Sequence, residues 1–479
     1  TQKQRLERLL SIGYDPDTAE RVAAIKDMSG DLGVDVRAAV NPLLRTTREV
    51  TGTELPQDRN IASILTPGSE SLTETAAYEL LVAKDLAPPL TTPDTLRAAL
   101  AANIDQGRVG GIPVAQLDSD EKRGAAYAAL AQAGLVSPLV TEADIKTALS
   151  KHIFFDAYNE PSSDVTDTAK EALKTIEAKV AANQVLDLTL DALSLASIYF
   201  LAAIGLAITF GVMGVINMAH GEFIMMGAYT GYVVQQIILD NTVSIIVAIP
   251  LAFAVTFAAG VAMERLVIRW LYSRPLETLL ATFGISIALQ QLAKNIFGTQ
   301  ARPLTAPGWL DGAWVINDVV SISYIRIAIF VLAFVFLAIF LFIMKRTRLG
   351  LETRAVTQNP RMAASMGINP GRVNMLTFGL GSGIAGVAGV AIGLFAKVTS
   401  ELGNDYIVQS FMTVVVGGVG NIWGTLAGAA MIGFLQKGIE WFNPSNTLAA
   451  QTFMIVFIII FIQFRPRGII ALKGRAAGD

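Results

Sequence analysis

The chain has 479 residues, of which 52% are hydrophobic and only 16% are charged, whereas about 25% of residues carry charge in soluble domains. It contains no cysteine, so disulfide scaffolds, thiolate metal sites and thiol nucleophiles are excluded, and we expect no metal site. The net charge is −3 and no long basic run occurs, which argues against a nucleic-acid partner. Charge is concentrated in the first third, so composition predicts a soluble region followed by a membrane region.

The first region, residues 1–185, alternates amphipathic segments with turn signals. Helical spacing of apolar residues appears in residues 94–104, 122–135 and 167–186. We therefore predict a soluble helical domain. His152, the only histidine before the membrane region, fits a structural or surface role. Two interpretations stay open: a helical accessory domain, or a docking platform for a partner or substrate carrier.

The second region, residues 186–479, contains apolar stretches close to the roughly 20 residues that cross a bilayer as a helix. We predict an all-α, polytopic membrane domain with about eight membrane-embedded helical segments. These segments are residues 194–216, 222–239, 243–263, 279–297, 322–344, 374–396, an interrupted segment at 409–439, and 449–464.

Basic residues predict the orientation of these spans, because loops rich in Lys and Arg face the cytoplasm. Counting crossings from this basic side places residues 1–185 outside the cytoplasm, on the periplasmic side. An exported domain normally requires a signal sequence and no apolar leader is visible, so we expect this chain to be the processed form. The basic residues are Arg265, Arg269, Arg274, Lys345, Arg346, Arg348, Arg354, Arg361, Arg372, Arg465, Arg467, Lys473 and Arg475.

Two motifs interrupt apolar segments. The polar sequence Asn-Met-Ala-His-Gly-Glu at residues 217–222 is either a hydrated turn or a broken helix facing the transport pathway. The glycine-rich sequence at 417–421 breaks the segment 409–439, and such a break is tolerated at membrane depth only against protein or a wet cavity. Small residues at four-residue spacing predict close helix packing. They are Gly227 and Gly231, Gly379 and Gly383, and Gly420, Gly424 and Gly428.

Residues 345–372 form a long basic loop between two spans. Residues 361–366 favour a short helix, which Gly367 ends. A short rigid helix parallel to the membrane is what a soluble motor requires as a lever, although an ordinary cytoplasmic loop would also set topology. The chain has no G-x-x-x-x-G-K-[ST] motif, so any ATP that drives it is expected to bind a separate subunit.

At these segments the chain resembles the permease family of branched-chain amino-acid ABC importers. Within the family, LETLLAT at 276–282 and the tail RPRGIIALKGRA at 465–476 resemble the urea branch. The first 185 residues depart from the amino-acid branch, whose permeases begin almost directly with the first span. The matching stretches are residues 205–229, 274–286, 347–368, 410–429 and 464–476.

The resemblance implies a bacterial inner-membrane importer of several subunits. Its expected partners are a second, different permease, two ATP-binding-cassette ATPases, an extracytoplasmic solute-binding protein and membrane lipid. The chain itself would be no enzyme and bind no cofactor, since ATP and Mg would be held by the ATPases. The loop would supply the coupling helix. Its implied coupling residues are Arg354, Asn359, Arg361, Ala363, Ala364 and Gly367.

Urea, the solute that the resemblance implies, is flat and neutral, with one acceptor and four N–H donors. Amide, hydroxyl and backbone groups suit it without a fixed charge, although such groups also join membrane helices to one another. The candidate path residues are Asn217, His220, Glu222, Gln290, Gln291, Thr413 and Asn421.

Other functions stay open. The solute could be a branched-chain or other amino acid or an amide carried by the same kind of importer. A passive urea or amide channel would transport without an ATPase, but it leaves the long basic loop unexplained. A membrane receptor that senses a ligand through residues 1–185 is a third class, although no cytoplasmic signalling domain is appended.

Overall fold

The computed structural model describes residues 1–470 and divides into two compact units. The N-terminal unit is Thr1–Val180 and the membrane unit begins at Ala181. Helices dominate, so the predicted all-α polytopic class is confirmed. Lys473 and Arg475, two of the predicted cytoplasmic cations, lie outside the described residues.

The N-terminal unit is mainly helical but contains strands that the sequence did not suggest. Strand β5 (Ile153–Tyr158) is the centre of a three-stranded antiparallel sheet between β1 (Thr46–Thr51) and β2 (Ile61–Leu65). A small hairpin joins β3 (Arg108–Val109) and β4 (Ile112–Pro113). The helices are α1 (Gln2–Tyr14), α2 (Thr18–Met28), α3 (Val34–Val40), α4 (Glu74–Ala83), α5 (Pro93–Ala102), α6 (Asp120–Gln132) and α7 (Glu142–Ser150), with 3-10 turns η1 (Asn41–Leu44) and η2 (Val114–Gln116).

Ion pairs connect distant parts of the N-terminal unit. Arg5 on α1 contacts Asp31 at 3.0 Å and also pairs with Asp35 at the start of α3. Arg21 on α2 donates to Glu160 at 2.7 and 3.0 Å. Hydrogen bonds from Arg5 hold the pKa of Asp31 and Asp35 below the usual value. Burial opposes ionisation of Glu160, but hydrogen bonds from Arg21 and a backbone amide outweigh it and leave its pKa lowered.

These lowered pKa values make the N-terminal unit sensitive to acid. A carboxyl with a depressed folded pKa stabilises above its unfolded value of about 4, and this contribution is lost as pH falls through the folded pKa. We expect amide exchange in α1 and α3 of the full chain, corrected for intrinsic rates, to quicken between about pH 7 and about pH 3. Arg5→Gln should reduce that pH dependence. Equal protection at both pH values would contradict the role of these pairs.

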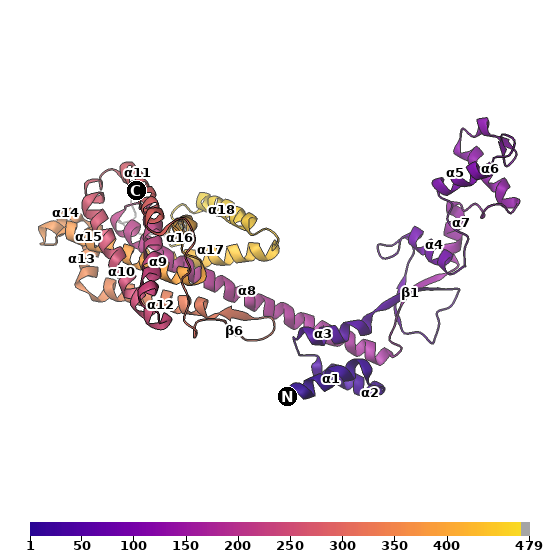
Figure 1. Ribbon diagram of the computed structural model, residues 1–479, viewed down its shortest axis with the longest axis horizontal. Helices are drawn as coiled ribbons and strands as arrows, with labels where there is room; N and C mark the ends of the chain where they lie inside the picture. Colours follow the sequence, from indigo (N-terminus) through magenta and orange to yellow (C-terminus); the bar gives the residue numbers. More distant parts are fainter. Residues whose placement is uncertain (471–479) are drawn as a thin grey trace. The chain divides into compact units, whose positions relative to one another are not determined.

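Helices occupy each of the apolar segments expected from the sequence of the membrane unit (Figure 1). Six helices are long and apolar enough to cross a membrane, and the bent pair α16–α17 raises the number to seven among the described residues. Helix α9 has 18 residues, as many as α18, but it is more polar and is largely buried among its neighbours. The segments are α8 (Ser163–Met213), α9 (His220–Ile237), α10 (Asn241–Leu266), α11 (Pro275–Phe297), α12 (Tyr324–Arg346), α15 (Pro370–Phe395), α16 (Asn404–Gly417) with α17 (Ile422–Phe442), and α18 (Thr447–Phe464).

Three short elements connect these spans. The turn η3 (Ile268–Trp270) follows α10, and the hairpin of β6 (Ala313–Val315) and β7 (Ser321–Ser323) precedes α12. Helices α13 (Arg348–Gln358) and α14 (Pro360–Ser365) occupy the basic loop. Helix α8 is continuous over 51 residues, so the predicted helix at 167–186 and the first span form one helix.

Helix α15 forms the centre of the membrane unit because small residues let other helices approach it. An ideal Cβ added at Gly227 on α9 would lie 1.9 Å from the carbonyl oxygen of Gly386 on α15, and one added at Gly205 on α8 would lie 2.2 Å from that of Gly381. A methyl group does not fit in these gaps, so the backbones are in direct contact. The predicted packing role extends beyond the glycines named from spacing.

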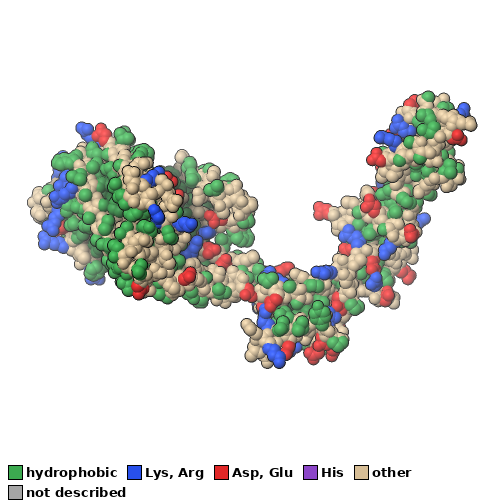
Figure 2. All heavy atoms as spheres, in the orientation of Figure 1, with side chains coloured by type: hydrophobic (Ala, Val, Ile, Leu, Met, Phe, Trp, Pro, Cys, Tyr) green, Lys and Arg blue, Asp and Glu red, His purple; other side chains and the backbone are tan. Residues whose placement is uncertain are grey.

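The outer surface of the membrane unit is apolar. Large hydrophobic side chains are exposed along α10, α11, α12 and α18, among them Leu280, Phe342 and Phe453 at 72%, 61% and 59%. Apolar exposure of this extent on several helices fits contact with lipid tails. Figure 2 shows Lys and Arg gathered at one end of this unit, where Figure 1 places α13 and α14.

Candidate functional site

The polar motif at 217–222 lies at a break between α8 and α9. Asn217 is 1% exposed and its Oδ1 accepts a hydrogen bond from the Ala219 amide at 3.0 Å. His220 Nε2 donates to the carbonyl oxygen of Ala202 at 2.7 Å. Both side chains are therefore satisfied by backbone groups and shape the break. The motif is therefore a buried break between two helices and not a turn at the surface.

Glu222 is the centre of a buried polar cluster. It is 1% exposed, and its Oε1 accepts hydrogen bonds from Ser286 Oγ and Gln290 Nε2, both at 2.8 Å. The same Gln290 amide donates to Asn404 Oδ1 at 3.0 Å. Oε2 of Glu222 has no hydrogen-bond partner among the described residues. The cluster therefore joins α9, α11 and α16, and it contains one buried carboxylate oxygen without a partner among the described residues.

Helix α11 contacts the rest of the unit through apolar residues such as Leu289 and Phe297 and through a row of polar side chains, which we call the polar face of α11. The Thr282 hydroxyl accepts from the Met218 amide at 3.2 Å, and Lys294 pairs with Glu401 at 3.1 Å. Four-residue spacing places these side chains on one side of the helix. They extend over about 24 Å, close to the roughly 30 Å of a bilayer core. The polar face consists of Thr278, Thr282, Ser286, Gln290 and Lys294.

The opposite side of α11 is apolar and exposed, with Leu276, Leu280 and Phe283 at 81%, 72% and 50%. A membrane helix normally packs on its neighbours through apolar and small residues. Helix α11 adds a row of inward-facing polar side chains to such apolar packing, an arrangement that suits the lining of a hydrated path. The sequence analysis found Gln290 but missed Thr278, Thr282 and Ser286, although their regular spacing was a usable signal.

The other candidate path residues lie outside this cluster. Gln291 is exposed, on a different side of α11 from Gln290. Thr413 is fully buried, and its hydroxyl donates to the Gln409 carbonyl of the preceding turn at 2.7 Å. Asn421 caps α17, accepting from the Trp423 and Gly424 amides at 2.9 and 3.2 Å. The structure thus gives Thr413 and Asn421 local structural contacts.

The glycine-rich break at 417–421 lies between α16 and α17, which meet at a bend of 120°. The amides of Ile469 and Ile470, beyond the end of α18, donate to the carbonyls of Val416 and Gly417 at 2.8 and 3.1 Å. The chain therefore turns sharply at this break.

A cavity of about 320 Å³ adjoins this break. Asn421 lines it together with Arg354 of α13 and Lys345 at the end of α12. A candidate path residue and a candidate coupling residue therefore share one hollow at the basic side of the membrane unit.

The candidate coupling residues lie on α13, on α14 and around the turn that follows it. Asn359 caps α14 by accepting from the Met362 amide at 3.1 Å. Ala363 is buried against Val356 and Val373, whereas Arg361 and Ala364 are exposed. Gly367 ends the helix at φ +89°, a conformation that favours glycine. The result is a short helix seated on one apolar side and open on the other, with Met362 and Met366 exposed at 60% and 76%.

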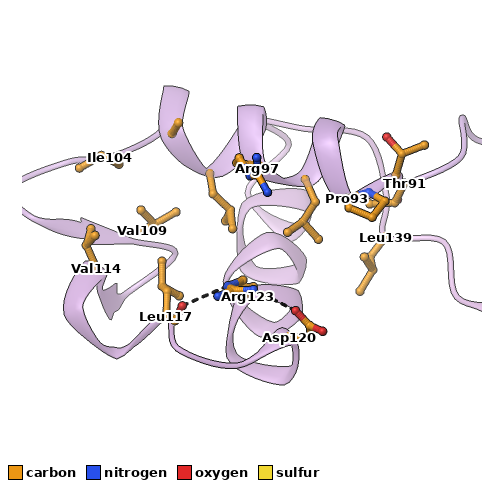
Figure 3. A pocket seen from close by; sticks show the side chains of 14 residues that line it. Thr91, Pro93, Arg97, Ile104, Val109, Val114, Leu117, Asp120, Arg123 and Leu139 are labelled. Carbon is orange, nitrogen blue, oxygen red and sulfur yellow. Dashed lines mark hydrogen bonds and ion pairs between the residues drawn. The ribbon is translucent and has the colours of Figure 1, made fainter.

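The N-terminal unit has a cavity of about 610 Å³ between α5, α6 and the β3–β4 hairpin (Figure 3). Apolar side chains such as Leu100 and Val109 form its walls. Arg123 at its edge donates to the Leu117 carbonyl and to Asp120 at 3.1 and 3.0 Å. None of the candidate residues named from the sequence lines this cavity. Among the described residues, no group of three or more His, Asp or Glu is placed to hold a metal ion.

Comparison with known proteins identifies relatives of the membrane unit. The permease protein LivH of the high-affinity branched-chain amino acid transport system of Escherichia coli strain K12 is 29% identical over 295 residues, covering 58% of this chain and 93% of LivH. BraD of Pseudomonas aeruginosa, the permease protein of a system with the same description, is 30% identical over 291 residues, covering 58% and 94%. The inner membrane ABC transporter permease protein YjfF of E. coli is 26% identical over 287 residues, covering 57% and 82%. No solved structure matches the chain.

Residues 188–463 match the family described as "Branched-chain amino acid transport system / permease component". This range begins within α8 and ends within α18, so it includes the Glu222 cluster, the polar face of α11 and the basic loop. The match covers more than half of the chain, and the chain therefore belongs to the branched-chain amino acid transport system permease family.

Proposed function

We propose that this chain forms the translocation path for urea in an ATP-binding-cassette importer. The observation that carries the proposal is the polar face of α11 against Glu222. Its central groups are hydroxyls and an amide, which suit a neutral solute with one acceptor and four N–H donors. The unpartnered Oε2 of Glu222 is a further acceptor for those donors. The likeness of residues 276–282 to the urea branch supports the same solute.

The proposed complex contains a second permease, two ATPases and a solute-binding protein, in a bacterial inner membrane. Names of relatives support this arrangement, since they are permease proteins of transport systems. Residues 345–372, with α13 and α14, would receive the ATPases, and the N-terminal unit would lie on the periplasmic side. Arg354, Asn359, Arg361, Ala363, Ala364 and Gly367 keep their proposed coupling role.

Uptake by the purified complex in proteoliposomes tests the solute. ATP-dependent accumulation of labelled urea, with excess leucine or glutamine failing to compete, is the expected result. Accumulation of leucine without urea would instead identify a branched-chain amino acid importer and contradict the urea assignment.

A passive channel predicts a different outcome in the same system. This chain alone, in liposomes without ATPase, would then equilibrate urea across the membrane. Under the proposed function the chain alone is impermeable, and uptake requires both the ATPases and ATP. Passive flux through the isolated chain would favour the channel.

Gly367→Val is expected to uncouple ATP hydrolysis from uptake. Valine at φ +89° is strained, so the turn after α14 would shift and α14 would lose its fixed orientation. The measurement is solute-stimulated ATP hydrolysis by the reconstituted complex. The matched control is Gly438→Val, because an added Cβ at Gly438 also meets nothing within 4 Å but the position is helical. Normal solute-stimulated hydrolysis in the Gly367 variant would refute the lever assignment.

A further inference from the structure

Glu264 is a fully buried carboxylate that the proposed path does not use. It lies in the last turn of α10 and is 0% exposed. Its Oε1 accepts a hydrogen bond from the Tyr272 hydroxyl at 2.7 Å. Its Oε2 lies 3.5 Å from Nη2 of Arg269 and has no hydrogen bond among the described residues. Glu264 thus holds Arg269 and Tyr272, from η3 and the following turn, against the end of α10.

Such a cluster is not explained by stability alone. Removing a carboxylate from water is costly, and replacing a buried ion pair by apolar residues is often neutral or stabilising. An ionisable residue inside a membrane helix bundle is therefore a functional hypothesis by default. The contacts of the side chains that Glu264 holds in place should indicate its role.

Arg269 reaches from this cluster to the start of α15. Its Nη2 donates to the carbonyl oxygen of Gly371 at 3.2 Å. Gly371 lies in the first turn of α15, which Asn369 caps by accepting from the Gly371 and Arg372 amides at 3.1 and 3.3 Å. Only a few residues separate this turn from the end of α14. The Glu264 cluster therefore binds the first turn of α15 directly beside the proposed coupling segment.

Beyond that first turn, α10 and α15 pack together along most of their length. An ideal Cβ added at Gly383 on α15 would lie 2.7 Å from the Phe253 ring, and one at Gly386 would lie 2.2 Å from the Thr256 hydroxyl. The same Gly386 touches Gly227 of α9, the helix that bears Glu222. A displacement at the start of α15 would thus reach the polar cluster through tightly packed backbone.

We propose that Glu264, Arg269 and Tyr272 form a joint that fixes the first turn of α15 to the end of α10. The joint makes α10 and α15 move as one body when the ATPases displace α14. The three side chains are positioning residues and touch no solute. This inference rests on the proposed ATP-driven function, but it is independent of which solute is carried.

The first test is the coupling ratio of the reconstituted complex, measured with whichever solute the wild-type complex imports. Glu264→Gln keeps an acceptor for Tyr272 and removes the charge that holds Arg269. We expect basal ATP hydrolysis to persist and solute imported per ATP to fall by about tenfold, within the range typical of coupling between sites. Tyr272→Phe keeps the ion pair, so a smaller fall is expected.

The matched control is Glu277→Gln, which removes a carboxylate that pairs with Arg274 at 3.2 Å near the start of α11 and is 54% exposed. It should leave the ratio unchanged. A wild-type ratio in assembled Glu264→Gln complex overturns the joint. A wild-type complex without ATP-dependent uptake of any solute overturns the proposed function instead.

The second test reads the joint without transport. The chain has no cysteine, so spin labels at Leu266→Cys on α10 and Met366→Cys after α14 report one distance; both positions are exposed, at 75% and 76%. We expect a narrow distance distribution in the parent chain and a broader one when Glu264→Gln is added. Glu277→Gln should leave the distribution narrow. Equal widths in the parent and the Glu264 variant would overturn the joint even if the variant complex fails to assemble.

Discussion

Replacing Gln290 with leucine is expected to reduce solute uptake by about 10- to 100-fold, the factor that corresponds to losing one or two hydrogen bonds to a charged group. Gln290 belongs to the polar face of α11 and connects Glu222 to Asn404. Leucine has a similar size, so the helix should still pack while the path loses its amide. The measurement is initial uptake rate by the reconstituted complex, normalised to assembled protein.

The neighbouring glutamine provides the control for this substitution. Gln291 has the same side chain on the same helix but is exposed on another side. Gln291→Leu should therefore transport at the wild-type rate. Equal rates in both variants would remove the polar face of α11 from the path, and equal loss in both would indicate a general effect on α11.

Replacing Gly389 with valine is expected to prevent folding of the membrane unit. An ideal Cβ at this position would lie 1.8 Å from the Ile224 carbonyl oxygen and 2.9 Å from the Ala228 amide nitrogen. Both are backbone atoms of α9, which cannot rotate away. We expect the variant to be destabilised by at least the roughly 1–3 kcal/mol that overpacking of a well-packed core usually costs. The measurement is the yield of monodisperse protein in detergent together with its melting temperature.

Gly284→Val is the matched control, because an added Cβ at Gly284 on α11 meets nothing within 4 Å. It places the same β-branched residue in another membrane helix of the same chain. We expect near-normal yield from this variant. Wild-type yield and melting temperature from the Gly389 variant would show that α9 and α15 do not meet as closely as the structure has them.

Much of the membrane fold follows from the sequence because a bilayer allows few solutions. The length of apolar stretches predicted the spans to within a few residues. The span predicted at 243–263 is the helix Asn241–Leu266 in the structure, and the span predicted at 322–344 is Tyr324–Arg346. Glycines at 417–421 located the break between α16 and α17. Local signals sufficed in each case, since a membrane helix satisfies its own backbone hydrogen bonds.

Non-local pairing was beyond the same reasoning. Strand β5 pairs with β1, so that Ile153 faces Thr51 more than 100 residues earlier in the chain. Neither strand has a strong alternating pattern, since Thr46–Thr51 is half exposed. The continuity of α8 could not be predicted for another reason. Its first part is polar and its second part apolar, so composition suggested two separate helices where the backbone forms one.

The candidate site was found in part. Sequence reasoning selected Glu222 and Gln290, which the structure brings together, because a polar residue in an apolar segment requires a partner. Asn421 was selected for the same reason, and its side chain both caps α17 and lines the cavity at the break. Ser286 and Thr282 were missed because a single hydroxyl in a membrane helix is a weak signal of function. Only their shared spacing with Gln290 places them on one side of the helix.

Thiol accessibility tests the central claim, that the polar face of α11 lines the path. Since the chain has no cysteine, single substitutions Thr282→Cys, Ser286→Cys and Leu280→Cys can each be treated with a charged thiol reagent during ATP turnover. We predict that Cys at 282 and 286 is labelled and is protected by excess solute, while Cys at 280, on the exposed apolar side, stays unreacted. Labelling at 280 alone, with 282 and 286 inert in every state, would contradict the account.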